Sequence, residues 1–154
     1  MTQKANKRFK KIVFGADFSE SSVEAFKLAL QMSDKDTEID IVHIAPHETN
    51  RGIVTPHLDE ALADKAMKDY HAETMQLLDE KYISTCKTDA KLTVVVLVGT
   101  PNEEILKHAI DVNSDLIVMG MNGKLGIGRM LLGRVVEKLI RASHIPVLVV
   151  PRHE

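Results

Sequence analysis

The residues best suited to chemistry are three glycines, Gly120, Gly123 and Gly133, in the spacing G-x2-G-x9-G. They follow an apolar run over 116–119 and precede a helical pattern that begins near Val135. Glycine lets the backbone approach a ligand closely, and a glycine at a helix start leaves unpaired N–H groups and the positive dipole end facing an anion. The spacing therefore predicts an anion-binding turn, with phosphate as the anion.

The same glycines also have structural interpretations. Gly120 can end a strand, Gly123 and Gly126 can shape turns, and Gly133 can allow close packing. The spacing alone leaves both interpretations open.

Length and charge limit the class of protein. A chain of 154 residues is long enough for one domain with a full core. Lys and Arg total 20 against 22 Asp and Glu, so the net charge of −2 provides no electrostatic footprint for nucleic acid. The basic start is followed by only three apolar residues, 12–14, which is too short for a signal peptide, and no apolar run approaches the roughly 18 to 20 residues of a membrane span. We therefore expect a cytoplasmic protein without membrane insertion, in which the single cysteine, Cys86, forms no internal disulfide.

Strands and helices are predicted to alternate along the chain. Short apolar runs predict five strands, at 11–14, 39–44, 92–98, 116–119 and 146–150. Helical periodicity predicts four helices, at about 19–32, 63–78, 100–113 and 133–143. Such alternation is typical of an α/β fold with one open parallel sheet covered by helices on both faces. The segment 47–57 has no clear period and is predicted to be a loop.

Several local features follow from these patterns. Ser19 is a predicted N-cap, and Thr100-Pro-Asn-Glu103 has the pattern of a capping box with proline at the first helical position. The third strand is apolar on both faces, which favours a central or covered position. Helical spacing assigns several apolar side chains to buried faces, among them Leu77, Ile110 and Ile140.

In a sheet of this kind, ligands bind beyond the carboxyl ends of the strands at a topological switch point. Two candidate turns follow predicted strands. One is Gly15-Ala-Asp-Phe-Ser19, and the other is the glycine turn after 116–119.

Over 10–152 the chain resembles the universal stress proteins of the nucleotide-binding kind. The opening KKIVFGADFSESS, the pair His43-Ile44, the segment Val98 to Ile105, the spaced glycines and the closing IPVLVVPR carry the resemblance. Their order and spacing together are specific. We expect a polar tail over 1–9 and a universal stress protein domain over 10–154.

The resemblance implies a five-stranded parallel sheet of order 3-2-1-4-5, with its switch point between strands one and four. It implies a stress-response regulatory protein that binds an adenine nucleotide (ATP, ADP or AMP), with or without Mg²⁺ and without a dedicated metal site. Ala16 and Asp17 would lie near adenine and ribose, Ile44 would line the adenine pocket, and the glycine turn would hold the phosphates. Asp17 can also be a helix-cap residue and Ile44 ordinary core. The implied nucleotide-binding residues are Ala16, Asp17, Ile44, Met119, Gly120, Asn122, Gly123, Gly133, Arg134 and Val135.

We also predict a homodimer. The last strand carries an apolar edge that a monomer would leave unpaired. The resemblance implies the same arrangement, because members of the family form dimers through this strand. The residues of that edge are Val147, Leu148, Val149 and Val150. A further protein partner, of unknown identity, is expected for a regulatory protein.

One position departs from the family pattern. ATP-binding members have Ser or Thr directly after the third glycine, where this chain has Arg134. The hydroxyl is lost, but the guanidinium can pair with phosphate and, with Lys124 and Arg129, makes the turn cationic. The alternatives are a solvated basic face and an interaction module that binds no nucleotide but keeps the fold and the dimer.

Other ligand and enzyme classes fail on spacing. The segment 128–135 resembles half a P-loop but lacks its Lys and its Ser or Thr, and a Rossmann glycine fingerprint is absent from the first turn. His43, His47 and His57 show no helical metal-ligand spacing, and a histidine at a strand end is more often packed than metal-bound. No nucleophile, base and orienting group occur together, so we expect no catalytic residues and at most slow ATP hydrolysis.

Overall fold

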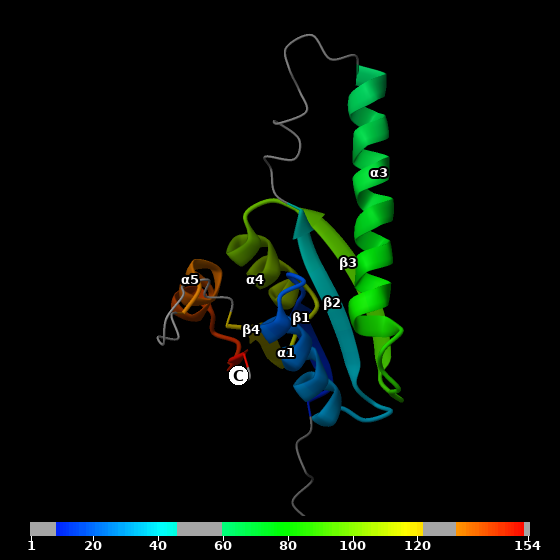
Figure 1. Cartoon of the computed structure of the whole chain (residues 1–154). Helices are drawn as coiled ribbons and strands as arrows, with labels where there is room; N and C mark the ends of the chain where they lie inside the picture. The colour runs from blue at the N-terminus through cyan, green and yellow to red at the C-terminus, as the bar shows by residue number, and fades with distance from the viewer. Residues whose placement is uncertain (1–8, 46–59, 122–131, 153–154) are drawn as a thin grey trace, which may run out of the picture.

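The computed structural model describes residues 9–45, 60–121 and 132–152. Strands and helices alternate along it, as Figure 1 shows. The strands are β1 (Lys11–Gly15), β2 (Glu38–Ala45), β3 (Lys91–Val98), β4 (Leu116–Gly120) and β5 (Val147–Val150). The helices are α1 (Glu20–Gln31), α3 (Glu60–Leu78) continued by the π-helix η1 (Asp79–Ile83), α4 (Pro101–Asp111) and α5 (Arg134–Ala142). The predicted loop 47–57 lies outside the described residues.

The five strands form one parallel sheet in the order β3-β2-β1-β4-β5. This confirms the predicted α/β class and strand order. The order reverses at β1, because the chain moves to β2 and β3 on one side and to β4 and β5 on the other.

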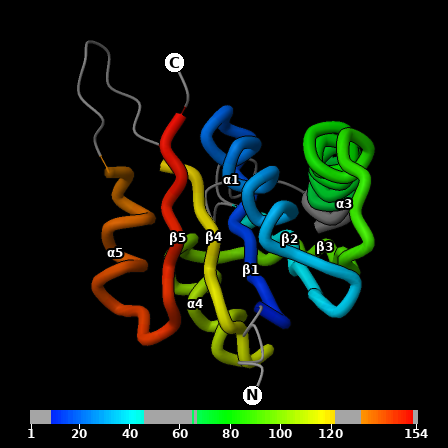
Figure 2. The backbone as a smooth tube through the Cα atoms, turned by 90° about the horizontal axis from the view of Figure 1, so that it is seen from below, coloured from blue at the N-terminus to red at the C-terminus, as the bar shows by residue number. Residues whose placement is uncertain are grey.

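Helices cover both faces of the sheet, and Figure 2 shows the two layers. Alternate residues of β1 point to opposite layers. Ile12 and Phe14 pack with α1 and η1, whereas Val13 packs with α4 and α5. All three side chains are fully buried, as expected for a strand covered on both sides.

Local sequence signals set the helix ends. The Ser19 side chain accepts the Ser22 N–H at 3.2 Å and caps α1, as predicted. Thr100 is the N-cap residue of α4, but its side chain makes no cap bond. Its carbonyl accepts the N–H groups of Glu103 and Glu104. The same helix ends two residues before Asn113, which has a φ of +52°. The N–H groups of Asn113 and Ser114 bond back to Ile110 and Ala109, which is a Schellman motif.

The prediction for the third strand held in one of its two alternatives, whereas a prediction for three helix side chains was wrong. Among the described residues β3 pairs with β2 alone, so it lies at an edge of the sheet as the resemblance implied, but its side chains pack on both helical layers. Its last residue, Val98, is 40% exposed. An apolar pattern on both faces indicates cover by helices, but it does not separate an edge strand from a central one. Leu77, Ile110 and Ile140 are 40%, 58% and 44% exposed, respectively, because each lies beside the buried line of its helix. In α3 and η1 that line runs through Thr74, Leu78 and Tyr82, at a constant spacing of four.

A charge cluster around the buried Asp40 lies near the starts of β1 and β2. The Asp40 carboxylate on β2 accepts the Lys11 ammonium at 2.8 Å and His108 Nε2 at 2.7 Å. Burial works to lower the pKa of Lys11, but hydrogen bonds to Asp40 and Glu38 outweigh it, so this pKa stands above its ordinary value of 10.5. The cluster ties α4 to the sheet at the end opposite the predicted ligand turns.

Within the described residues, no helix is long and apolar enough to cross a membrane.

Candidate functional site

The carboxyl end of β1 brings three predicted site residues to one edge of the sheet. Gly15 pairs with Val42 of β2 and Met119 of β4, and the Ala16 N–H donates to the Val42 carbonyl at 2.8 Å. This register places Ala16 beside the carboxyl ends of β2 and β4, which carry Ile44 and Met119. All three are buried, with Ile44 and Met119 packed on the α4 and α5 side.

Asp17 begins the turn that leads into α1. Its side chain is exposed, and its Oδ1 accepts the Ser19 N–H at 2.9 Å and the Ser19 hydroxyl at 2.5 Å. Phe18, between them, has a φ of +65°, a left-handed conformation that is uncommon for a bulky residue. Asp17 therefore supports the N-cap residue of α1 through these two hydrogen bonds, while the Asp17 carboxylate stays at the surface.

His43 anchors this turn from β2. Its Nδ1 lies 2.8 Å from the Ala16 carbonyl and its Nε2 lies 3.3 Å from the Tyr70 hydroxyl on α3. Since a carbonyl only accepts, Nδ1 donates to Ala16, while Nε2 lies within hydrogen-bond distance of the Tyr70 hydroxyl. The His43 and Phe18 ring centroids are 4.7 Å apart. The histidine is thus packed, as predicted, and no group of three metal-ligating side chains occurs among the described residues.

The first glycine of the predicted anion turn has a packing role. A Cβ on Gly120 would lie 2.4 Å from the Ser22 nitrogen and 2.6 Å from the Ser21 carbonyl carbon. The end of β4 therefore lies directly against the first turn of α1, and no side chain fits between them. Close backbone approach was the predicted use of glycine here, but in this structure the neighbouring backbone is that of α1.

The last glycine of the motif begins α5. Gly133 is the N-cap residue, with φ −62° and ψ 151°, and it has no side chain to bond the first N–H groups. Arg134 is exposed at the first helical position, and Val135 is half-buried. Figure 2 shows the start of α5 at the same end of the sheet as the start of α1. Asn122, Gly123, Lys124 and Arg129 lie outside the described residues.

Comparison with known proteins places the chain. The model of the universal stress protein family matches residues 8–151. The universal stress protein MJ0577 of Methanocaldococcus jannaschii is 32% identical, over 94% of this chain and 96% of that protein. The chain belongs to the universal stress protein family.

Solved universal stress proteins share the fold. The structure of MJ0577 superposes with a TM-score of 0.72 at 29% identity, covering 96% of this chain and 99% of that one. A universal stress protein in complex with cAMP gives a TM-score of 0.60 at 24% identity, over 95% and 99% of the two chains. One from Archaeoglobus fulgidus in complex with dAMP gives 0.55 at 15% identity, over 93% and 98%.

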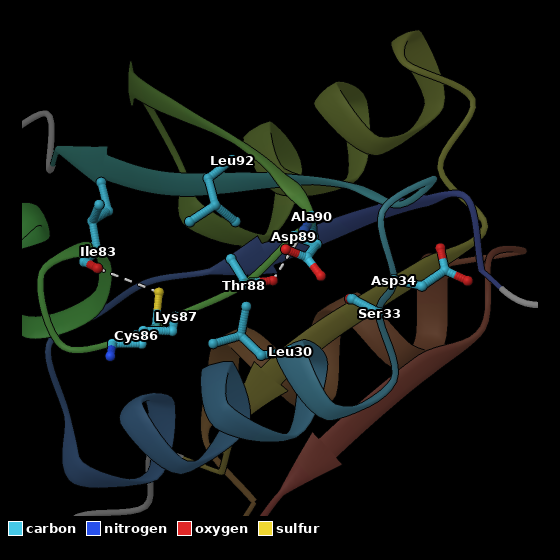
Figure 3. A pocket seen from close by; sticks show the side chains of 10 residues that line it. All are labelled: Leu30, Ser33, Asp34, Ile83, Cys86, Lys87, Thr88, Asp89, Ala90 and Leu92. Carbon is cyan, nitrogen blue, oxygen red and sulfur yellow. Dashed lines mark hydrogen bonds between the residues drawn. The ribbon is translucent and has the colours of Figure 1, made fainter.

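A separate cavity of about 820 Å³ lies at the other end of this universal stress protein domain. Figure 3 shows Leu30 from α1 and Leu92 from β3 pointing toward each other across it. Its lining residues are Leu30, Ser33, Asp34, Ile83, Cys86, Lys87, Thr88, Asp89, Ala90 and Leu92. None of these is a predicted site residue. Burial raises the pKa of Cys86, so the thiol in this cavity has little nucleophilic character.

Two residues that matter at the β1 turn escaped the sequence prediction. Lys81 and Tyr82 of η1 bond the carbonyl and the N–H of Phe18. The predicted buried face of the long helix stopped at Leu78, although the same spacing of four, continued once more, reaches Tyr82. The signal was present, but the following turn is a π-helix rather than the end of the helix.

Proposed function

We propose that this chain is a cytoplasmic stress-response regulatory protein that binds an adenine nucleotide at the switch point between β1 and β4. One observation carries the proposal. The turn with Ala16 and Asp17, the end of β4 and the uncapped start of α5 lie at the same end of the sheet. Universal stress proteins of this fold in complex with cAMP and dAMP support adenine as the base.

The residues divide the ligand between them. Ala16, Ile44 and Met119 provide buried apolar surface for a base, and the exposed Asp17 carboxylate suits ribose hydroxyls, which donate hydrogen bonds. The first N–H groups of α5, at Arg134 and Val135, and the positive end of its dipole suit phosphate. In this proposal Asn122 and Gly123 complete the phosphate contacts, ATP or AMP is the nucleotide, and hydrolysis is at most slow.

Assembly is part of the proposal. Within the part of the chain that the structure describes, β5 pairs with β4 alone, and its Val147, Leu148 and Val149 are half-buried, so one edge of the strand is offered for pairing. Pairing of that edge with a second copy satisfies its backbone groups and covers the valines. In this dimer a protein partner would bind either at the nucleotide end of a subunit or on a surface formed by both subunits.

The direct test is to identify small molecules released from the purified protein by mass spectrometry, followed by calorimetry with ATP and AMP. Release of an adenine nucleotide, or saturable binding of either one, supports the proposal. A protein that releases no nucleotide and binds neither compound is instead the interaction module.

Substitution of Arg134 separates nucleotide binding from the interaction module, because the two roles of its side chain predict opposite changes in ATP affinity. A guanidinium that bonds phosphate contributes about 1.5 to 3 kcal/mol, so Arg134→Ala should weaken ATP binding about tenfold or more. If the side chain instead obstructs the site, Arg134→Ser should create or strengthen ATP binding. Arg141→Ala is the matched control, because it removes the same charge from the last turn of α5, where Arg141 pairs with Glu137 at 3.1 Å.

A further inference from the structure

The turn after β1 is held by two consecutive residues of η1, which packs on the same face of the sheet as α1. Phe18 donates its N–H to the Tyr82 hydroxyl at 2.9 Å, and its carbonyl accepts the Lys81 ammonium at 2.9 Å. Both residues belong to η1, whose i→i+5 bond joins the Ser84 N–H to the Asp79 carbonyl at 2.8 Å. π-helical turns are rare and occur frequently at functional sites. The left-handed Phe18 is therefore fixed on both sides of its own backbone.

The donors and acceptors around Tyr82 can be assigned in one direction only. The Ser22 hydroxyl donates to the Ser19 carbonyl at 2.9 Å. Because a hydroxyl has one proton, Ser22 must accept the Tyr82 O–H, whose oxygen lies 2.6 Å away. The Tyr82 oxygen in turn accepts the Phe18 N–H. The chain of bonds runs from Phe18 through Tyr82 and Ser22 to Ser19, and so it spans the turn next to Asp17.

The Tyr82 ring and its hydroxyl have separable roles. The ring is fully buried and makes edge contacts with Phe14 and Phe26, at centroid distances of 5.3 Å and 5.5 Å. That packing belongs to the core and needs no hydroxyl. A phenolic oxygen in the same place is useful because it bonds the backbone of the turn, and burial raises its pKa, so it stays protonated.

We propose that the Tyr82 hydroxyl is a positioning group for the nucleotide site, holding the Asp17 turn in its binding geometry without touching the ligand. The inference rests on the function proposed above and extends it to the α3 and η1 layer. Removal of the hydroxyl leaves the Phe18 N–H without this acceptor and frees a strained residue to relax. The neighbouring Asp17 is then no longer held in one position relative to the end of the sheet.

The test is a double-mutant cycle measured by calorimetry with AMP, using the wild type, Tyr82→Phe, Asp17→Ala and the double variant. Tyr82→Phe should weaken AMP binding about threefold to tenfold, in the range of one hydrogen bond. In the Asp17→Ala background the same change should cost less than about twofold, because the hydroxyl acts through the Asp17 turn. Ser22→Ala is the control: it removes the other partner of the hydroxyl but leaves the bond to Phe18, and it should preserve most of the affinity.

A second measurement covers the case in which Asp17→Ala abolishes binding. Amide hydrogen exchange of the free protein, followed by NMR, should show the Phe18 N–H exchanging at least about tenfold faster in Tyr82→Phe, with β1 amides unchanged. Equal losses of affinity in both backgrounds, or wild-type affinity and exchange in Tyr82→Phe, overturn the positioning role alone. Absence of AMP and ATP binding by the wild type overturns the proposed function and this inference together.

Discussion

Replacing Gly120 with alanine separates the packing role of this residue from a ligand role. The added Cβ would lie 2.4 Å from the Ser22 nitrogen and 2.6 Å from the Ser21 carbonyl carbon. Ordinary carbon contacts are about 3.5 to 4.0 Å, so β4 and the first turn of α1 must separate by roughly 1 Å. The atoms in the way are backbone, and they move only if the whole turn moves.

The cost follows from two opposing effects. Overpacking a close-packed site costs about 1 to 3 kcal/mol, and a clash with backbone belongs to the upper part of that range. Alanine also restricts the unfolded chain, which returns about 0.4 to 1 kcal/mol. The net loss in the free energy of unfolding is therefore about 1 to 2.5 kcal/mol.

Urea denaturation measures this loss. With a slope of about 2 kcal/mol per molar urea, the midpoint should fall by roughly 0.5 to 1.3 M without a change in slope. Gly15→Ala is the matched control at the end of the neighbouring strand. Its Cβ would meet the Met119 sulfur at 2.2 Å, and a thioether can rotate away, so the loss should stay below about 1 kcal/mol.

The opposite pattern would refute this reasoning. If Gly120→Ala keeps the wild-type midpoint but loses AMP binding, the glycine is needed for the approach of the ligand and the contact with α1 is not limiting. Equal losses in Gly120→Ala and Gly15→Ala would show that the α1 backbone yields as easily as a methionine side chain.

Three other perturbations probe the turn, the charge cluster and the edge of the sheet. Asp17→Ala should lower AMP affinity in calorimetry while circular dichroism stays nearly unchanged, since the weakened cap costs only about 1 kcal/mol; global unfolding with unchanged binding per folded molecule would make Asp17 structural. Asp40→Ala should destabilise the protein by about 1.5 to 3 kcal/mol in urea, because Lys11 loses one of its two carboxylate partners and His108 Nε2 loses its contact at 2.7 Å. Lys11 has a raised pKa, so its charge stabilises the fold fully below pH 10.5 and loses this effect as the pH rises through the folded-state pKa; the alkaline loss of stability should be smaller in Asp40→Ala. Val149→Lys should shift a dimer toward monomer in light scattering, and a monomeric wild type at micromolar concentration would contradict the proposed β5 interface.

Periodic features of the chain were predictable. The strands, the cap at Ser19 and the start of α5 at Gly133 follow from local patterns that the tertiary structure keeps, and the strand order came from the family resemblance. Local signals fail where a side-chain orientation or a residue distant in the sequence decides. Thr100 occupies the predicted cap position, yet its side chain forms no cap bond, because such a bond depends on a side-chain orientation that the sequence does not specify.

The candidate site shows the same division. Its strand ends could be located, because register and topology bring the ends of parallel strands to one edge. The supports of the β1 turn could not, since Tyr82 is far from Phe18 in sequence and the left-handed φ of Phe18 has no signature in its residue type. Gly120 was recognised as a special position, but only the structure shows that the adjacent backbone belongs to α1.

The two helical layers contribute to the proposed site in different ways. On one face, His43, Tyr70 and Tyr82 link the β1 turn to α3 and η1 through hydrogen bonds, so that layer determines where Ala16 and Asp17 lie. On the other face, α5 supplies its N-terminus, which contributes charge and N–H groups rather than position. A change in the α3 layer should therefore affect all adenine nucleotides alike, because they share the base and ribose. A change at the start of α5 should alter the ratio of ATP to AMP affinity, because these ligands differ only in their phosphates.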